Sequence, residues 1–157
     1  MFVYKDTPVW RAARAMQTND CSFLPVVENG IALGVVTAED LAYRIVGKPD
    51  NPITSPVSEI MSSPAFGLCC ESSVEDAARL MRYRGVHRLI LTDERGVLRG
   101  VISLGNLVGY LDSDTIAKTL LRLTETSGPG VPEASFSWLS TLDFEDQLGV
   151  TTRRLMT

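Results

Sequence analysis

The chain has 157 residues, of which 45% are hydrophobic and 22% are charged, a composition typical of a globular protein with a packed core. Its formal net charge of -4 at pH 7 and its pI of about 5.0 argue against the basic surface that nucleic-acid binding usually requires. We therefore expect no nucleic-acid partner.

The first part of the chain predicts a strand at its start, then a helix, a hairpin and a second helix. TPVWRAARAM (7–16) predicts a helix capped by Thr7, because its apolar residues recur at helical spacing after a proline. FLPVVENG (23–30) and LGVVT (33–37) are β-rich runs separated by turn residues, which predicts a hairpin. AEDLAYRIVG (38–47) predicts the second helix.

The same pattern occurs a second time. VEDAARLM (74–81) aligns with VWRAARAM (9–16) at an offset of 74 − 9 = 65, and GVISLGNL (100–107) aligns with GVVTAEDL (34–41) at 100 − 34 = 66. The sequence therefore predicts a mixed α/β (α+β) fold built from two β-α-β-β-α repeats. A unit of roughly 50 residues buries too little surface to be stable alone, so we expect the repeats to pack sheet to sheet with pseudo-two-fold symmetry.

Composition places the boundaries of this organisation. We expect repeat 1 at residues 1–50, a linker at 51–57, repeat 2 at 58–112 with SEIM as a short helical lead-in, and a C-terminal helix and tail at 113–157. DSDTIAKTLLRLT (112–124) predicts an amphipathic helix capped by Ser113 or Asp114. The remainder of the tail, with Trp138 and Phe144, belongs to neither repeat and has no assigned role.

Two interpretations fit the Thr-x-x-Asp pattern at Thr37 and Asp40, between a strand and a helix. As a capping box, the threonine accepts a backbone N–H and the carboxylate reaches back to the cap; Ser103 and Asn106 can do the same more weakly. As a ligand site, the hydroxyl donates to phosphate and the carboxylate accepts from a ribose diol, while Gly34 lets a base approach the backbone. Both interpretations can hold at once.

The repeated AARxM helix, the two hairpins and the two Gly-hydrophobic-hydrophobic-[Thr/Ser]-x-x-[Asp/Asn] motifs resemble the cystathionine β-synthase (CBS) domain, which occurs in tandem pairs. The resemblance covers about residues 3–111. It implies a free-standing CBS pair, or Bateman module, whose two clefts bind adenosine-containing molecules. AMP, ADP, ATP and S-adenosylmethionine are the ligands it implies.

Within that resemblance, the motif acid holds the ribose and the motif hydroxyl lies near the phosphates, which assigns these roles to Asp40 and Thr37. VHRL (86–89) is similar to the segment of the γ subunit of AMP-activated protein kinase that supplies a histidine and an arginine to phosphates. Cleft one would then combine Thr37 and Asp40 with His87 and Arg88. His87 can equally be a packed or solvent-facing residue, whereas the permanently charged Arg88 is the better phosphate ligand.

Cleft two would combine Ser103 and Asn106 with Ser22 and Phe23, the uncharged counterparts of the histidine and arginine. Asn106 replaces the aspartate of the family motif, which puts ribose recognition in doubt there. We therefore expect cleft one to be the nucleotide site, and cleft two to be weak, empty or used by a neutral nucleoside.

The resemblance implies a regulatory module, not an enzyme, that senses an adenine nucleotide or S-adenosylmethionine, forms a homodimer and signals to another, unidentified protein. The alternative is a structural or protein-interaction pair that binds no small molecule and acts through dimerisation and the tail. The sequence shows no nucleophile with a base, no metal cluster and no P-loop, so we expect no catalytic residue and no metal.

Cysteine spacing and hydropathy indicate the compartment. Cys21, Cys69 and Cys70 form no CxxC pair and leave an odd count, so neither a zinc site nor a disulfide framework is expected. No apolar run approaches the roughly 20 residues that a membrane helix needs, and residues 1–16 lack the apolar core of a secretory signal. We expect a cytoplasmic protein without a membrane partner.

Overall fold

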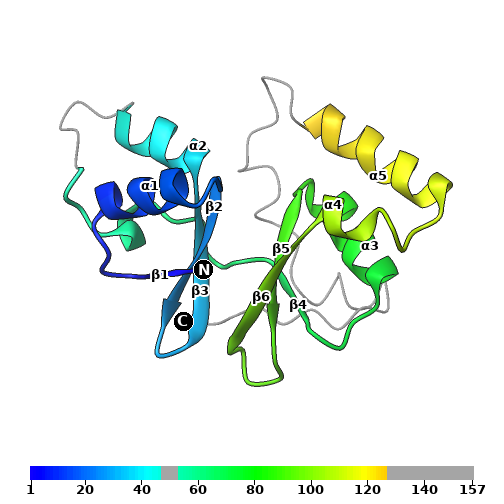
Figure 1. Ribbon diagram of the computed structural model, residues 1–157, viewed down its shortest axis with the longest axis horizontal. Helices are drawn as coiled ribbons and strands as arrows, with labels where there is room; N and C mark the ends of the chain where they lie inside the picture. Colours follow the sequence, from blue (N-terminus) through cyan, green and yellow to red (C-terminus); the bar gives the residue numbers. More distant parts are fainter. Residues whose placement is uncertain (47–52, 127–157) are drawn as a thin grey trace. The chain divides into compact units, whose positions relative to one another are not determined.

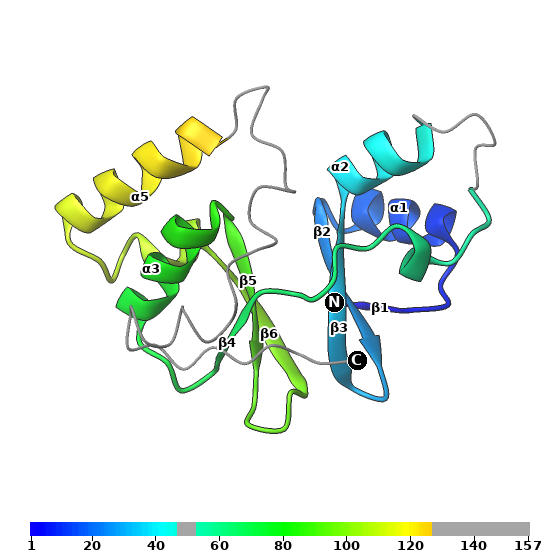
Figure 2. The ribbon, with the colours of Figure 1, turned by 180° about the vertical axis from the view of Figure 1, so that it is seen from behind.

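The computed structural model describes residues 1–46 and 53–126, which form two compact units (Figures 1 and 2). The first contains β1 (Val3–Tyr4), α1 (Val9–Thr18), β2 (Phe23–Glu28), β3 (Ile31–Thr37), α2 (Ala38–Leu41), the π-helix η1 (Ala42–Val46) and the 3₁₀-helix η2 (Val57–Glu59). The second contains β4 (Gly67–Cys69), α3 (Val74–Arg84), β5 (Arg88–Thr92), β6 (Leu98–Ser103), α4 (Leu104–Leu107) and α5 (Ser113–Thr126), except that Glu94–Leu98 is grouped with the first unit. The predicted mixed α/β class and the β-α-β-β-α order of both repeats are confirmed.

The first unit is built on a three-stranded sheet in the order β1-β2-β3. β1 runs parallel to β2, with Val3 opposite Val26, and β2 runs antiparallel to β3. Asn29 (φ 50°) and Gly30 (φ 82°) form the turn of this hairpin, because both residue types tolerate the left-handed conformation. The antiparallel pairing ends at Phe23 and Thr37, so the motif threonine is the last residue of β3 and the N-cap of α2.

The core of the first unit lies between this sheet and α1. Val9, Ala12 and Met16 form the buried stripe of α1, as the helical spacing predicts. They pack in one cluster with residues from the strands and from η1 and the segment that follows it: Val3, Leu24, Val26, Val36, Ile45, Val57 and Ile60.

Residues 53–66, here called the connector, pack on the first unit although the sequence repeat places most of them in the second. Val57 and Ile60 are fully buried in the core of the first unit. Ser62 forms a two-way backbone bridge with Val35 of β3, with N···O distances of 2.8 and 2.9 Å. The short helical lead-in predicted at SEIM overlaps η2, and this stretch up to Phe66 is grouped with the first unit.

The connector also replaces the cap expected for α1. Thr7 does not cap the helix, because its Oγ1 accepts the N–H of Tyr4 instead, and the N-cap position is Pro8, which makes no side-chain cap bond. The first two N–H groups of α1 donate to the carbonyl groups of Ser55 and Ile53. The acceptors for the free N–H groups at the start of α1 therefore come from a segment more than forty residues later in the chain, which local sequence rules do not reveal.

The second unit repeats the arrangement with the sheet order β4-β5-β6. α3 begins at the cap residue Ser73, whose Oγ accepts the Asp76 N–H, and it ends at Gly85 in the left-handed conformation (φ 66°). Its core lies around α3, α4 and α5: Leu68, Ala77, Ala78, Leu80, Met81, Leu89, Leu104, Leu107 and Leu123 are buried together.

Helix α5 is capped by Asp112, one residue before the predicted Ser113 and two before Asp114. Asp112 Oδ1 accepts the Thr115 N–H at 2.9 Å, and this bonding to Thr115 lowers the pKa of the Asp112 carboxyl. The remaining residues of the predicted tail, including Phe136, Trp138 and Phe144, lie outside the described residues.

Packing of the connector on β3 predicts different responses to alanine at the two aligned glycines. A Cβ added at Gly34 would lie 2.6 Å from Ser62 O and 3.0 Å from Met61 Sδ, whereas one at Gly100 meets none of the described atoms within 4 Å. We expect Gly34→Ala to lower the free energy of unfolding by about 1–3 kcal/mol, as overpacking does. Gly100→Ala, the matched control, should stay within about 0.5 kcal/mol of wild type. Urea unfolding measures both, and equal effects would contradict this account of the connector.

Candidate functional site

Thr37 and Asp40 form a complete capping box at the start of α2. Thr37 has extended backbone angles (φ −116°, ψ 165°), and its Oγ1 accepts the Asp40 N–H at 3.1 Å. In return, Asp40 Oδ2 accepts the Thr37 N–H and the Thr37 hydroxyl, each at 2.8 Å. The structural interpretation of the Thr-x-x-Asp motif is confirmed.

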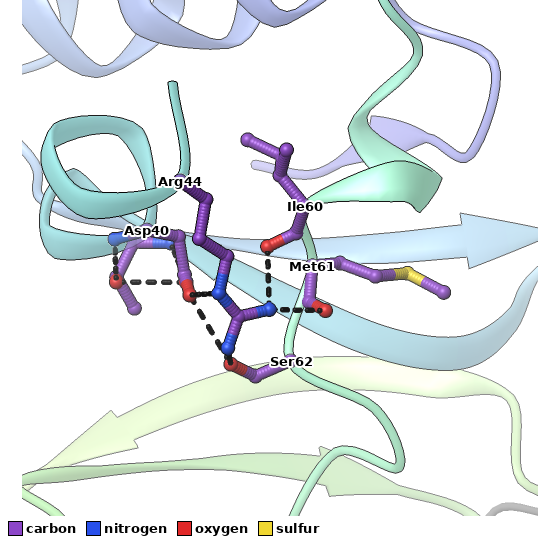
Figure 3. A network of polar contacts seen from close by, with 6 residues as sticks. Asp40, Arg44, Ile60, Met61 and Ser62 are labelled. Atoms are coloured by element: carbon purple, nitrogen blue, oxygen red, sulfur yellow. Dashed lines mark hydrogen bonds and ion pairs between the residues drawn. The ribbon is translucent and has the colours of Figure 1, made fainter. Parts of the chain in front are cut away.

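The second oxygen of Asp40 is bound by residues that the motif does not contain (Figure 3). Asp40 Oδ1 accepts the Ser62 hydroxyl at 3.2 Å and lies 3.3 Å from Arg44 Nε. The side chain of Asp40 is only 7% exposed, and that of Arg44 is 36% exposed. A buried carboxylate is costly unless it is paired and hydrogen-bonded, and here both conditions are met.

Arg44 ties the carboxylate to the connector. It lies one turn after Asp40 in the π-helix η1, an element often found at functional sites. Its Nη1 donates to the carbonyl groups of Ile60 and Met61, both at 3.0 Å, and its Nη2 lies 3.4 Å from Ser62 Oγ (Figure 3). A planar guanidinium suits this task because its fork of donors can serve several acceptors at once.

Arg44 and Ser62 are the site residues that the sequence interpretation missed. The i,i+4 spacing of Asp40 and Arg44 on a predicted helix was a signal for their ion pair. Ser62 gave no signal, because its contact with Asp40 exists only once the connector packs on β3.

Contacts with the connector explain why position 34 is a glycine. The space above its Cα, which was expected to admit a base, holds Ser62 O and Met61 Sδ of the same chain. Close approach of the connector backbone to β3 therefore requires a glycine here whether or not a ligand binds.

The aligned motif in the second unit is smaller and more exposed. Asn106 Oδ1 accepts the Ser103 N–H at 2.9 Å and the Ser103 hydroxyl at 2.7 Å, so the polar cap is kept without a charge. Asn106 is exposed, in contrast to the buried Asp40, whereas Ser103 is half-buried like Thr37. The position aligned with Arg44 holds Tyr110, which is 75% exposed.

His87 and Arg88 are exposed residues of the second unit, at the start of β5. The carbonyl of His87 accepts the N–H of Leu104, which places it beside the start of α4 in the same unit. Ser22 has the equivalent place in the first unit, where its carbonyl accepts the N–H of Ala38. Within each unit, the helix that follows the motif is therefore bonded to the residue before the first strand of the hairpin, Ser22 in the first unit and His87 in the second. The pairing of Thr37 and Asp40 with His87 and Arg88 stays a prediction.

Two classes of site find no support in the part of the chain that the structure describes. Among residues 1–46 and 53–126, no three His, Cys, Asp or Glu side chains are grouped so that they could hold a metal ion. Over the same residues, the helices are too short or too polar to cross a membrane.

Comparison with known proteins identifies the family. The model of the CBS domain matches residues 1–47 and 57–113. The CBS domain-containing protein YhcV of Bacillus subtilis is 30% identical over 117 residues, which cover 74% of this chain and 82% of YhcV.

Two solved structures are similar to the fold. The CBS domain protein TA0289 of Thermoplasma acidophilum has a TM-score of 0.68 at 24% identity, over 78% of this chain and 70% of that one. CBSX2, solved in complex with AMP, has a TM-score of 0.61 at 26% identity, over 69% of this chain and 84% of that one. With two copies of the β-α-β-β-α unit and the family model matched over both, the chain belongs to the CBS domain family.

Proposed function

We propose that this CBS pair is a regulatory module that binds an adenosine-containing nucleotide, with Asp40 as the ribose acceptor. The observation that carries the proposal is the burial of Asp40, the only charged side chain in the buried set of the described residues. A capping box does not require a buried acid position, since the equivalent residue in the second unit, Asn106, is exposed. The burial of the Asp40 carboxylate is therefore a feature of this position and not of capping boxes in general, which supports a functional role for it.

The proposed ligand contacts follow the family resemblance. Asp40 accepts hydrogen bonds from the ribose hydroxyl groups, and Thr37 lies near the phosphates. Exposed His87 and Arg88 supply the donors to phosphate, and the Arg88 guanidinium can bind phosphate through two parallel hydrogen bonds. The uncharged pair at Ser103 and Asn106 forms a weaker second site. The AMP complex of CBSX2 supports AMP as the first ligand to test, with ADP, ATP and S-adenosylmethionine beside it.

Isothermal titration with these four ligands tests the proposal. We expect one binding event per chain for at least one of them, weakened by about tenfold or more in Asp40→Asn and in Arg88→Ala, the usual loss for a charge-assisted hydrogen bond. Asp40→Asn keeps the shape of the side chain, and the second repeat already has asparagine at this position.

The control for Arg88→Ala is Arg99→Ala, which removes an exposed guanidinium from β6 of the same sheet. Unchanged binding in this control and weakened binding in the two site variants supports the assignment. Equal binding in all four proteins would remove Asp40 and Arg88 from the site.

The second candidate function is a structural or interaction module without a small-molecule ligand. It is favoured by the complete internal bonding of Asp40, whose two oxygens already have four donors among Thr37, Arg44 and Ser62. On this account the thermal midpoint of a folded sample should not change with any of the four ligands. A shift that grows with nucleotide concentration would exclude it, because a ligand that binds the native state raises its stability by mass action.

The resemblance also leads us to propose a homodimer. Both units expose large apolar side chains next to their second helices, including Tyr43 (79%), Val46 (80%) and Tyr110 (75%), and such surfaces often mark protein contacts. Sedimentation velocity should give twice the 17.2 kDa chain mass. Tyr43→Glu should shift the sample towards the monomer mass, and a wild-type protein that stays at the monomer mass at high concentration would contradict this.

A further inference from the structure

Arg44 is the one residue in Figure 3 that contacts both the motif carboxylate and the backbone of the connector. Its Nε lies 3.3 Å from Asp40 Oδ1, and its Nη1 donates to Ile60 O and Met61 O at 3.0 Å. The next residue, Ser62, forms the backbone bridge that fixes the connector to β3. A change at Asp40 can therefore affect the connector through two successive polar contacts, from Asp40 to Arg44 and from Arg44 to the carbonyl groups of Ile60 and Met61.

The acceptor capacity of Asp40 is already used. An ionised carboxylate has about four lone-pair positions. Two accept from Thr37 at Oδ2, and two are directed to Ser62 Oγ and Arg44 Nε at Oδ1. A vicinal diol that donates two hydrogen bonds must therefore displace two of the present donors.

The donors at Oδ1 are the ones that can leave. The two contacts at Oδ2 are shorter, 2.8 Å each, and their loss would open the capping box and leave the start of α2 unsatisfied. The contacts at Oδ1 are longer, 3.2 and 3.3 Å, and the Arg44 guanidinium keeps the carbonyl groups of Ile60 and Met61 as acceptors when its Nε leaves Oδ1. Displacement at Oδ1 therefore costs less than displacement at Oδ2.

We propose that Arg44 is a positioning residue that reports occupation of Asp40 to the connector. This inference rests on the proposed function. When a ribose diol takes Oδ1, Arg44 and Ser62 lose their shared acceptor, and the hold on residues 60–62 is weakened. The connector continues into β4, the first strand of the second unit, so the change is passed along the chain itself.

The ribose diol, not the base, is then the part of the ligand to which the connector responds. A 2′-deoxy nucleotide keeps the base and phosphate but donates one hydrogen bond fewer, so it displaces only one donor. AMP and 2′-deoxy-AMP are therefore the matched pair of probes.

Hydrogen exchange of peptides that cover residues 57–66 measures the state of the connector, because the Ser62 N–H is bonded to Val35 O. In wild type, saturating AMP should speed this exchange by about fivefold, the factor expected for loss of one net hydrogen bond. Saturating 2′-deoxy-AMP should give a smaller change. Arg44→Ala should show the faster exchange without ligand and little further response, while AMP affinity remains at least that of wild type because a competing donor is gone.

Arg79→Ala is the matched control. Arg79 forms a helical ion pair with Asp76 at the same 3.3 Å, and its side chain has the same 36% exposure as Arg44, but it belongs to the second unit. Exchange in residues 57–66 and its response to AMP should be unchanged in this variant.

The outcomes separate the two proposals. AMP binding to wild type without a change in connector exchange would overturn the role of Arg44 and leave the proposed function intact. An Arg44→Ala protein that retains the full AMP response, or that loses AMP binding as Asp40→Asn does, would also overturn it. If no ribonucleotide binds to folded wild type, the proposed function fails and this inference fails with it.

Discussion

The burial of one carboxylate is the constraint on which the first unit depends. Asp40 can be buried only because donors from three directions satisfy it: the cap residue Thr37, the following helical turn through Arg44, and the connector through Ser62. Each of these donors is placed by a separate element, so the end of β3, the π-helix η1 and the connector are held in register by the same group. The close approach of the connector in turn requires glycine at position 34.

The second unit shows what the fold needs when this group is absent. It has the same strand order, the same helix after the motif and a comparable buried core, yet its motif residue is the exposed amide of Asn106. The β-α-β-β-α unit therefore forms without a buried charge. The additional cost of burying Asp40 and pairing it with Arg44 is not a requirement of the fold, which supports a functional reason for it.

The sequence was sufficient for features that local rules determine. Periodicity and the repeat predicted both units, and spacing predicted the capping box of Thr37 and Asp40. The failures were contacts made over long sequence distance or by competing local bonds. The prediction of Thr7 as a cap was wrong because its Oγ1 accepts the Tyr4 N–H, while connector carbonyl groups accept the first N–H groups of α1. The contact of Ser62 with Asp40 was missed because the two residues lie 22 positions apart in the sequence. Most of the connector belongs to the second repeat by sequence, yet it packs on the first unit, and only the folded chain reveals this.

A crystal structure of the protein grown with AMP tests the central claim most directly. The account predicts that both ribose hydroxyl groups donate to Asp40, that Ser62 Oγ and Arg44 Nε have left Oδ1, and that the two Thr37 contacts at Oδ2 remain. AMP bound with its ribose away from Asp40, while all four present donors keep their places, would contradict the account and leave this carboxylate with a structural role alone.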